Sequence, residues 1–510
     1  MMRGMDSAVP PATFVLDGRS LTVPALVAIA DGARVAIDPA ATEAMARSRL
    51  VIERYLSESI PAYGLTTGLG LRADAALTVE EATMFSYRTV RGRAQAVGQP
   101  LHERAVRAAI VARLNTILDG TAGASAAIAP FLAEVLNRGL VPRMPRIGSI
   151  GSGDLVAMAS LAHALIGEGQ MLVDGDEVPA IDALHAVGLQ PLELLPKDGA
   201  VLCNNTAFSC GQAALAAHNA RVALRALQVA GALSLTAFQG SGTPFEAATL
   251  RARPQPGQVH AGDEIRLLVS VDGAMPAARR LQDPLSIRCI AQVNGAAFAA
   301  LDDLNESLLV ELNSSPDNPA VLVDQDRCVS TGNFHLPRLA QTLDTVARAL
   351  AWCATDSVSR VQRLMSASAS GLPRLLAAEG AGRAGFGPML KPLEALRAEV
   401  IHLSNPVPIM PSHNADGVED AVTFSALAAR KLDELVGQLR LIVAFELVAA
   451  SQAVDLRGAP VSAALTRVHA AVRALSPFID DDRPLAAEVE AVADQLVDSG
   501  AVVVQAYTSV

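Results

Sequence analysis

The sequence predicts a mainly α-helical protein built around a central bundle of long helices. Hydrophobic residues make up 51% of its 510 residues, but aromatic residues make up only 3%. Such a core consists mainly of Ala, Leu, Val and Ile, and it suits close packing between helices. Apolar residues also recur at helical spacing, as in 101–118, where Val106, Ile110, Leu114 and Ile117 share one face.

Helical spacing can be followed along most of the chain. Residues 13–36 are expected to form short strands and turns, and the helical pattern begins near residue 40. Helices are predicted at the following positions: 101–118, 124–138, 155–168, 206–239, 291–310, 336–368, 388–403 and 417–452. Polar, loop-rich regions at 170–198 and 240–290 separate them, and the tail at 459–498 suggests two more helices.

Two domains follow from this organisation. We expect a domain of active-site loops over residues 1–205 and a long-helix bundle over residues 206–510. Long helices with broad apolar faces are typical of bundles. They are also common where subunits meet, so an oligomer is expected.

Composition and spacing exclude several classes of protein. The chain has 41 Lys and Arg against 52 Asp and Glu, a net charge of −11, which argues against nucleic-acid binding. A strongly apolar stretch, 222–239, is interrupted by Arg225 and Gln228, so no membrane span is expected. The cysteines show no CxxC spacing and the histidines no HExxH pattern, and Asp6 stands where a secretory signal would be apolar. We therefore expect a reduced, cytoplasmic protein without a metal site.

Two glycine-rich segments carry residues suited to chemistry. Residues 63–70, YGLTTGLG, begin with Tyr63, and a phenol on such a loop transfers protons when nearby cations lower its pKa. Residues 148–155, GSIGSGDL, precede an apolar helix, and glycines around Ser152 resemble a helix cap or an anion-binding turn. The missing GK[ST] ending excludes a P-loop. Each segment alone is better explained as a structural turn or a capped helix.

Further polar segments lie between the predicted helices. They contain amides and carboxylates that, taken singly, are typical of helix caps. These segments are 197–199 (KDG) with 204–206 (NNT), 282–288 (QDPLSIR), 311–313 (ELN) with 317–319 (DNP), 332–335 (GNFH) and 419–420 (ED). Their order and spacing together are far more specific than any one of them.

In this order, the segments resemble those of the histidine, phenylalanine and tyrosine ammonia-lyases, the aromatic amino acid lyase family. The likeness runs from about residue 40 to about residue 450. It implies an elongated α-helical bundle that assembles as a homotetramer, with active sites shared between subunits.

The resemblance implies roles for the residues that match the family's motifs. Tyr63 matches the Tyr that removes the β-proton of the substrate. Arg288 matches the Arg that pairs with the substrate carboxylate, and a bidentate contact explains the use of Arg there. Glu419 matches the Glu that faces the imidazole ring in histidine-specific members. Further substrate-binding positions are matched by the following residues: Asn204, Gln282, Asn333 and Phe334.

Departures from the family pattern gather around the family's electrophile, methylidene-imidazolone (MIO). Family members form MIO by cyclising Ala-Ser-Gly within GSxGASGDL, whereas this segment is one residue shorter and has Gly-Ser-Gly at 151–153. Asn205, Ala207 and Leu285 also replace the family's Gly, Gln and Tyr at positions around the electrophile. Gly-Ser-Gly has the groups needed to cyclise, with Ser152 as its serine. The combined losses nevertheless predict that MIO is absent and that the protein uses no cofactor.

The ring-binding side of the site departs as well. Arg93 stands where histidine lyases carry a ring-contacting His, and Gly387 replaces a bulky Met, which leaves room for a larger ring. Lys391, one of three lysines in the chain, follows this segment and is either a solvated helix residue or part of the site. Arg93, Lys391 and His413 are the candidates for stabilising charge that develops on the ring.

A substrate that needs no electrophile accounts for these losses. An ordinary α-amine is a poor leaving group that MIO activates, whereas a trimethylammonium group leaves as a neutral amine without activation. With Glu419 to bind an imidazole and space for sulfur on the ring, we expect the ergothionase type of family member. Such an enzyme eliminates trimethylamine from ergothioneine to give thiourocanate. Tyr63, Lys391 and Arg93 would be its catalytic residues.

Two alternatives stay open. The chain is a histidine ammonia-lyase if residues 151–153 do form MIO, because Tyr63, Arg288 and Glu419 serve both reactions. A non-catalytic binding relative on the same scaffold is the more distant alternative. Tyr63 weighs against it, because binding alone needs no phenol on a glycine-rich loop.

Overall fold

The computed structural model of the chain describes residues 12–68, 76–275, 277–377, 382–459 and 461–508. Asp6, Leu69 and Gly70 lie outside the described residues. The chain forms two compact units, each made of three stretches of sequence. Unit 1 comprises Met1–Leu215, Asn305–Gln341 and Val407–Ala429. Unit 2 comprises Ala216–Leu304, Thr342–Pro406 and Arg430–Val510.

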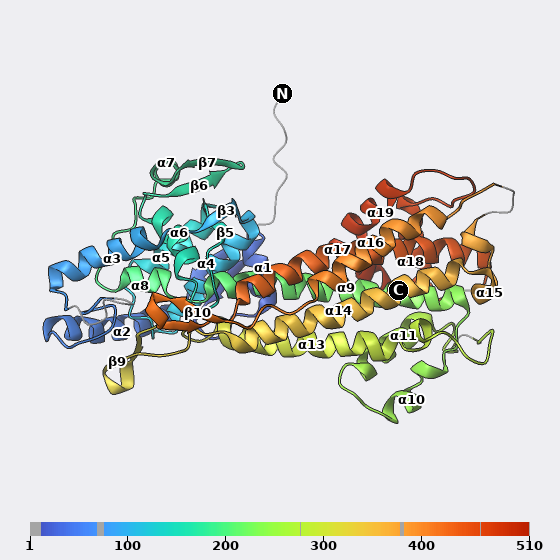
Figure 1. Cartoon of the computed structure of the whole chain (residues 1–510), viewed down its shortest axis with the longest axis horizontal. Coiled ribbons are helices and arrows are strands. Elements are labelled where there is room, and N and C mark those ends of the chain that lie inside the picture. Colours follow the sequence, from blue (N-terminus) through green and yellow to red (C-terminus); the bar gives the residue numbers. More distant parts are fainter. Residues whose placement is uncertain (1–11, 69–75, 276, 378–381, 460, 509–510) are drawn as a thin grey trace. The chain divides into compact units, whose positions relative to one another are not determined.

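Unit 1 combines short helices with all the described strands (Figure 1). Its helices are α1 (Val23–Ala30), α2 (Pro39–Ser57), α3 (Val79–Arg93), α4 (Glu103–Leu118), α5 (Ile128–Asn137), α6 (Leu155–Leu165), α7 (Ala180–Ala186) and α8 (Asp198–Cys203). Its strands are β1 (Thr13–Leu16), β2 (Arg34–Ile37), β3 (Val97–Pro100), β4 (Val141–Pro142), β5 (Pro145–Ile147), β6 (Gln170–Val173), β7 (Asp176–Pro179), β8 (Ala320–Leu322), β9 (Arg327–Val329), β10 (Pro411–Asn414) and β11 (Glu419–Ala421). They pair as β1–β2, β3–β5, β4–β6–β7, β8–β9 and β10–β11, and every pairing except the parallel β1–β2 is antiparallel.

Helix α4 forms much of the core of unit 1. Residues Val106–Leu118 are all buried, and α4 packs against α1 and α5. The buried Arg107 side chain donates to the carbonyls of Ile29 (2.9 Å), Ala30 (3.1 Å) and Leu136 (3.0 Å). A buried guanidinium is costly unless its N–H groups are bonded, so these carbonyls at the ends of α1 and α5 explain how α4 accommodates Arg107.

Helices α3, α6 and α8 pack on one another and hold two loops of unit 1 in place. Helix α3 begins with a capping box, in which Thr78 and Glu81 bond each other's backbone N–H groups at 2.9 and 3.2 Å. Helix α6 starts directly after the 148–154 segment, and α8 ends directly before Asn204. Both loops therefore leave the same three-helix cluster.

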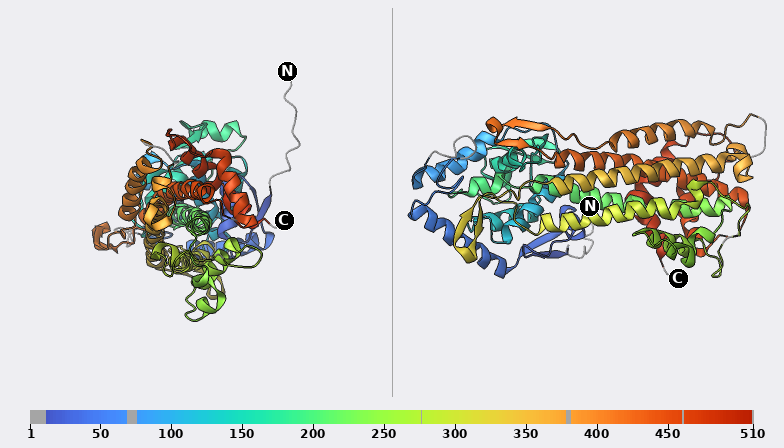
Figure 2. Two further views of the ribbon diagram at one scale, coloured as in Figure 1. Left: turned by 90° about the vertical axis from the view of Figure 1, so that its right-hand side faces the viewer. Right: turned by 60° about the horizontal axis from the view of Figure 1, so that its bottom comes forward.

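Long helices that run side by side dominate unit 2 (Figures 1 and 2). Four of them include residues of both units: α9 (Ala207–Phe238), α13 (Ile290–Leu312), α14 (Pro337–Met365) and α17 (Ser425–Arg457). The other helices of unit 2 are α10 (Ala247–Arg251), α11 (Gln258–Val269), α12 (Leu285–Arg288), α15 (Ala367–Ser370), α16 (Leu390–Leu403), α18 (Ala463–Leu475), α19 (Ala486–Val492) and α20 (Ala501–Tyr507). A π-helical turn at Ala493–Asp498 extends α19, and 3-10 turns lie at Thr243–Phe245, Arg374–Leu376 and Gly387–Met389. In unit 1, 3-10 turns lie at Val323–Gln325 and Ala415–Gly417.

A buried polar cluster joins three long helices inside unit 2. The carboxylate of Glu446 on α17 accepts hydrogen bonds from Ser234 on α9 (2.7 Å) and from Ser357 on α14 (2.5 Å). It also forms a bidentate ion pair with Arg360 on α14, at 2.5 and 2.8 Å, and both charged side chains are fully buried. Because every oxygen of Glu446 has donors, the cluster fixes how these helices meet in an otherwise apolar core.

The mainly helical fold class is confirmed, with three local corrections to the predicted elements. The 13–36 region contains helix α1, whose apolar residues face the core on nearly all sides and so give no helical pattern. The 240–290 region contains α11. The helix expected from residue 417 begins at Ser425, because the preceding residues form the β10–β11 hairpin. The domain division expected at residue 205 stays a prediction.

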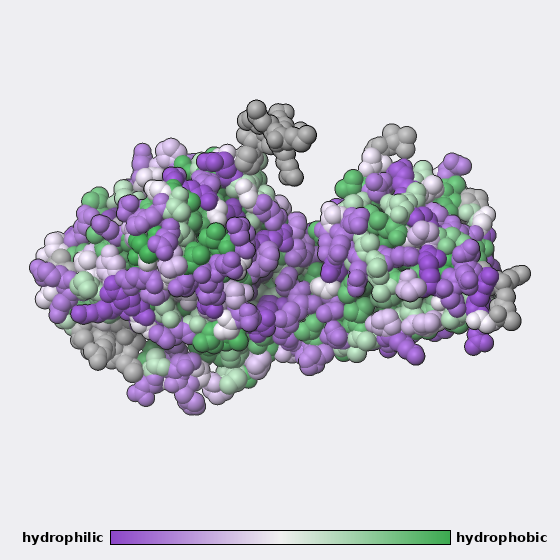
Figure 3. All heavy atoms as spheres, turned by 90° about the horizontal axis from the view of Figure 1, so that it is seen from above, coloured by the Kyte–Doolittle hydropathy of each residue, from purple (hydrophilic) through white to green (hydrophobic). Residues whose placement is uncertain are grey.

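Polar side chains cover much of the visible surface (Figure 3). The face drawn in Figure 3 is mostly hydrophilic, with smaller apolar areas between the polar ones. Among the described residues, no helix has the length and apolar character that crossing a bilayer requires.

Candidate active site

The 151–153 segment forms a tight turn between β5 and α6. Gly151 and Gly153 both have left-handed backbone conformations, with φ of +75° and +73°. A Cβ on Gly151 would lie only 2.2 Å from the Thr423 hydroxyl and 2.8 Å from the Phe424 nitrogen. Both the conformation and the lack of space therefore require glycine at residue 151.

Two distant stretches of unit 1 anchor this turn. Ser152 pairs with His335 in an isolated antiparallel bridge, and the Gly153 N–H donates to the Phe334 carbonyl at 3.1 Å. The Thr423 hydroxyl donates to the Gly151 carbonyl at 2.7 Å. Ser152, whose exposed fraction is 7%, is thus held from the 332–335 segment on one side and from the segment after β11 on the other.

Asp154 secures the end of the turn at the start of α6. Its buried carboxylate accepts from the Ser149 hydroxyl at 2.5 Å, and from both the backbone N–H and the hydroxyl of Ser209 at 2.8 Å. Burial raises the pKa of the Asp154 carboxyl, and these hydrogen bonds oppose the rise. The Ser425 hydroxyl donates to Ser209 at 3.1 Å, which extends the cluster to α17.

Asn204 lies against the same turn. Its amide donates to the Asn318 carbonyl at 3.0 Å, and its Oδ1 is 2.9 Å from the position of a Cβ on Gly153. Asn318 Oδ1 in turn accepts from the Thr331 N–H at 3.0 Å. Asn333, predicted for substrate binding, is exposed, and its backbone N–H donates to the Thr331 hydroxyl at 3.4 Å. The structure therefore brings Asn204 to the turn and leaves Asn333 at the surface.

Asn205 has a structural explanation that the sequence did not reveal. Its side chain is fully buried and donates to the Leu202 carbonyl at 2.9 Å, while its Oδ1 accepts from the Ala207 N–H at 3.0 Å. These bonds cap the end of α8 and the start of α9. Only the backbone carbonyl of Asn205 meets the turn, by accepting from the Asp154 N–H at 2.6 Å.

Three buried charged residues, Arg113, Asp317 and Lys197, lie close to Asn204 and Asn318 in the sequence or bond residues next to them. Arg113 forms a bidentate ion pair with Asp317, at 2.8 and 3.1 Å, and also donates to the Val201 carbonyl at 2.5 Å. Lys197 is buried as well, with its ammonium group on the Ala122 carbonyl, and burial lowers the pKa of that group. These cations satisfy carbonyls and carboxylates, so their roles here are structural.

Glu419 starts strand β11, and its pKa reflects its surroundings. The side chain is half-buried, and burial raises the pKa of its carboxyl, whereas the nearby Arg93 guanidinium partly offsets the rise. His413 belongs to the paired strand β10 and is exposed. The structure thus brings Arg93 close enough to Glu419 for electrostatic interaction, and it places His413 in the same hairpin.

Tyr63 is half-buried in a turn between α2 and α3. Thr66 closes this turn: its hydroxyl donates to the Ile60 carbonyl at 2.7 Å and accepts from the Ala62 N–H at 2.8 Å. The Gly64 N–H bonds the Gly68 carbonyl at 3.3 Å. Tyr63 therefore projects from an internally bonded turn of unit 1.

The predicted carboxylate-binding residue lies in unit 2. Arg288 ends the short helix α12, and its guanidinium donates to the Gln282 side-chain oxygen. Arg360 donates to the Ser286 carbonyl at 3.3 Å, so the buried cluster described above also fixes α12. Leu285 has an exposed fraction of 62% and packs into no core.

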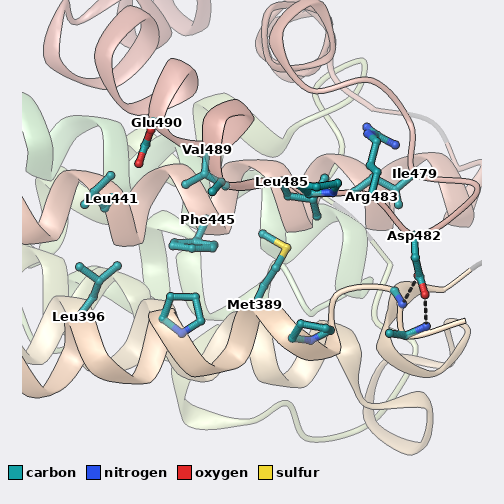
Figure 4. A pocket seen from close by; sticks show the side chains of 16 residues that line it. Met389, Leu396, Leu441, Phe445, Ile479, Asp482, Arg483, Leu485, Val489 and Glu490 are labelled. Carbon is teal, nitrogen blue, oxygen red and sulfur yellow. Dashed lines mark hydrogen bonds between the residues drawn. The ribbon is translucent and has the colours of Figure 1, made fainter.

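Lys391 and the segment before it belong to a different feature of unit 2. Lys391 is exposed near the start of α16. An apolar cavity of about 680 Å³ is lined by Ala384, Gly385, Pro388 and Met389, together with residues that include Leu396, Phe445 and Val489 (Figure 4). The Asp482 carboxylate accepts from the N–H groups of Ala384 and Gly385, at 2.8 and 2.9 Å. The space expected at Gly387 is narrowed by Leu375, whose Cδ1 lies 3.1 Å from the position of a Cβ.

Sequence reasoning missed several residues that hold the turn. Thr423, Ser209 and Arg113 bond it or its neighbours from separate parts of unit 1. Thr423 stands four residues after Glu419, so the matched segment pointed to its neighbourhood but not to its contact. Arg113 lies in the predicted 101–118 helix, and an Arg among apolar residues was the one available signal.

Known proteins match the chain over nearly its whole length. The family model for aromatic amino acid lyases matches residues 21–474. The histidine ammonia-lyase of Anaeromyxobacter dehalogenans is 35% identical over 505 residues, covering 96% of this chain and 99% of that protein. The histidine ammonia-lyase of Symbiobacterium thermophilum is 33% identical over 491 residues, covering 95% and 97%.

Solved structures share the fold. Histidine ammonia-lyase from Trypanosoma cruzi has a TM-score of 0.90 at 29% identity, covering 97% of this chain and 95% of that one. The Treponema denticola ergothionase, solved in complex with desmethyl-ergothioneine sulfonic acid, has a TM-score of 0.90 at 26% identity, covering 96% and 99%.

These comparisons correct two expectations. The expected elimination of trimethylamine from ergothioneine is contradicted, because curated relatives matching 95–96% of the chain at 33–36% identity are histidine ammonia-lyases, whereas the ergothionase is a structural neighbour at 26%. The expected absence of MIO is contradicted as well, since histidine ammonia-lyases of this family use that group. The physical reason is visible at Asn205, which caps a helix and leaves the turn undisturbed. The chain is a carbon–nitrogen lyase and belongs to the aromatic amino acid lyase family.

Proposed function

We propose that the chain is a histidine ammonia-lyase, which eliminates ammonia from histidine to give urocanate. One observation carries the proposal: the Thr423 hydroxyl bonds the Gly151 carbonyl, and Glu419 lies four residues earlier on the same extended segment. Four extended residues span at most roughly 14 Å. The backbone of Glu419 therefore lies within about 14 Å of Thr423, and the proposed substrate would bind between the Glu419 carboxylate and the turn.

Residues 151–153 fit the MIO group. Its formation joins the Gly153 nitrogen to the Gly151 carbonyl carbon and dehydrates Ser152, so it needs a close turn with small residues. Both glycines are in left-handed conformations, and the Asn205 side chain points into the helix caps instead of the turn. When formed, the group supplies an electrophile that converts the α-amine of the substrate into a better leaving group.

The matched residues supply the remaining chemistry. Tyr63 removes the β-proton as general base. Arg288 holds the substrate carboxylate, because only part of its guanidinium is used by Gln282 and a fork of N–H groups remains for a bidentate contact. Asn204, positioned against Gly153, orients the reacting end of the substrate.

The ring of the substrate binds at the hairpin. Glu419 accepts an imidazole N–H, and its raised pKa comes from the partial burial that also excludes water from the ring. Arg93, Lys391 and His413 are the candidates for stabilising charge on the ring. Arg93 is favoured by its effect on Glu419, whereas Lys391 belongs to unit 2. Phe334, whose carbonyl bonds the turn, and the exposed Asn333 beside it complete the proposed substrate-binding set.

The working form is proposed to be a cytoplasmic homotetramer with shared active sites. Trp352 on α14 is 70% exposed and lines a surface cavity of about 560 Å³ in unit 2, together with the exposed Ile401. A large aromatic side chain at the surface is typical of a subunit interface.

The test is turnover of purified protein with histidine, followed by the ultraviolet absorbance of urocanate. Ser152→Ala removes the serine of the turn and should abolish turnover. Ser160→Ala is the matched control, because Ser160 on α6 bonds only the Val156 carbonyl, at 3.4 Å. Product from ergothioneine with none from histidine, or full activity of the Ser152 variant, would overturn the proposal.

A further inference from the structure

The contact between Thr423 and Gly151 carries an inference beyond the reaction itself. We infer that Thr423 is a catalytic residue for the self-modification of residues 151–153, polarising the carbonyl at which the ring closes. The inference rests on the proposed function, since it concerns the formation of the electrophile that this function uses.

Thr423 and Phe424 donate hydrogen bonds to two successive carbonyls, those of Gly151 and Ile150. The Thr423 hydroxyl donates to the Gly151 carbonyl at 2.7 Å, and the Phe424 N–H donates to the Ile150 carbonyl at 3.0 Å. Thr423 is 8% exposed. A short hydrogen bond in such a water-poor place lowers the energy of negative charge on the acceptor oxygen more than it would in water.

Glycine at residue 151 makes this approach possible. A Cβ there would lie 2.2 Å from Thr423 Oγ1, so the hydroxyl occupies the volume that a side chain would fill. The family's motif carries Ala in the cyclising triplet, and this chain has Gly. The replacement of Ala by Gly in the triplet therefore coincides with a hydroxyl on the carbonyl that must react.

The opposite end of the turn is held as well. The Gly153 N–H donates to the Phe334 carbonyl at 3.1 Å, and this hydrogen bond increases the electron density on the nitrogen that must attack. The two reacting groups of the turn thus each have one bonded partner. Thr423 donates to the electrophilic carbonyl, and Phe334 accepts from the nucleophilic amide.

Ring closure then follows with balanced atoms. The Gly153 nitrogen forms a bond to the Gly151 carbonyl carbon, and the amide proton of Gly153 ends on the Gly151 oxygen. That oxygen leaves as the first water with the amide proton of Ser152. The Ser152 hydroxyl leaves as the second water with the Cα proton, giving the exocyclic methylidene. Thr423 stabilises the charge on the Gly151 oxygen during the first bond formation and is regenerated, and no oxidant or reductant is needed.

Intact-protein mass spectrometry tests the inference without relying on turnover. Completed ring closure lowers the mass of the full chain by two water molecules. Wild type and Thr423→Ser should show this loss, whereas Thr423→Val, which keeps the shape without the hydroxyl, should close its ring roughly 10²-fold more slowly. Each chain is made by cell-free synthesis, and samples are taken at intervals after synthesis, because a ring that has closed would survive unfolding and refolding. Thr236→Val is the matched control, because the Thr236 hydroxyl bonds only a carbonyl of its own helix, at 3.0 Å.

The outcomes separate this inference from the proposed function. Wild type without the loss of two waters would overturn both. Wild type and Thr423→Val losing water at the same rate would overturn the role of Thr423 and leave the proposed function intact. Thr423→Ala provides a second variant without the hydroxyl, and circular dichroism establishes that each variant is folded.

Discussion

Arg113 and Asp317 form a bidentate ion pair whose side chains are 0% and 2% exposed. Asp317 directly precedes Asn318, whose carbonyl accepts the hydrogen bond of Asn204. The pair therefore fixes the backbone that presents Asn204 to the turn at residue 153.

Breaking this pair should be costly. Asp317→Asn leaves the Arg113 charge buried without its counter-ion, and we expect a loss of about 3–5 kcal/mol in the free energy of unfolding. Asp31→Asn removes the partly exposed partner of Arg104 and should cost at most about 1 kcal/mol. Urea unfolding of both variants measures the difference. Equal losses in the free energy of unfolding would mean that the buried ion pair stabilises the protein no more than the exposed one.

Tyr63→Phe should remove the base and leave the binding surface in place. Turnover of histidine should fall by roughly 10²–10⁴-fold, while calorimetry still detects substrate binding. The control is Tyr87→Phe, since the Tyr87 hydroxyl accepts from the Leu194 N–H and is structural. Undiminished turnover in the Tyr63 variant would remove it as the base.

Arg288→Lys should act mainly on substrate binding. A lysine keeps the charge but cannot form the bidentate contact, so KM should rise by roughly 10- to 100-fold with a smaller change in kcat. Arg279→Lys is the control, because Arg279 bonds the Ala369 carbonyl and matches no family motif. An unchanged KM for Arg288→Lys would exclude it as the carboxylate partner.

Glu311 should make stability depend on pH. Burial raises the pKa of its carboxyl to about 7, so folding favours the protonated form. Its contribution is fully present below about pH 4.5 and is lost as the pH rises through about 7. Glu311→Gln should therefore be more stable than wild type at pH 8, by roughly 3 kcal/mol at most.

The comparison for Glu311 uses unfolding free energies at pH 5 and pH 8. Glu306→Gln serves as the control on the same helix, because the Glu306 side chain is 75% exposed. A pH-dependent difference that is the same for both variants would show that Glu311 titrates normally.

Gly151→Ala should lower the free energy of unfolding by more than the cost of placing alanine in a left-handed backbone conformation. A left-handed alanine costs about 1–2 kcal/mol, and here its Cβ also overlaps the Thr423 hydroxyl. Gly188→Ala has nearly the same φ, +74°, with its nearest atom 3.9 Å away, so it measures the conformational cost alone. Equal losses in thermal unfolding would mean that Thr423 moves aside easily.

The long helices were predictable from sequence because their apolar residues recur over many turns. Helix α4 spans 103–118 against a predicted 101–118, and α16 spans 390–403 against 388–403. The β10–β11 hairpin was not predicted, because the residues of 411–421 are mostly polar or exposed and show no alternation typical of a strand. Its place next to the turn depends on tertiary contacts.

The site was only partly predictable for a similar reason. Matched motifs identified Asn204 and Glu419, and both belong to unit 1. Asn204 lies against Gly153 of the turn, and Glu419 precedes by four residues Thr423, which bonds the turn. The same comparison misjudged Asn205, because a motif position does not say that the side chain turns away to cap α8. Lys391 is exposed on a helix, and its predicted part in catalysis rests on sequence alone.

The order in which the chain is synthesised limits when the turn can mature. Gly151 and its partner Thr423 are 272 residues apart, and ribosomes add roughly 5–20 residues per second. The turn therefore leaves the ribosome about 15–50 s before its anchor exists. During that interval Ser152 is an ordinary serine on a nascent chain, so a truncated product ending before residue 423 should carry an unmodified turn.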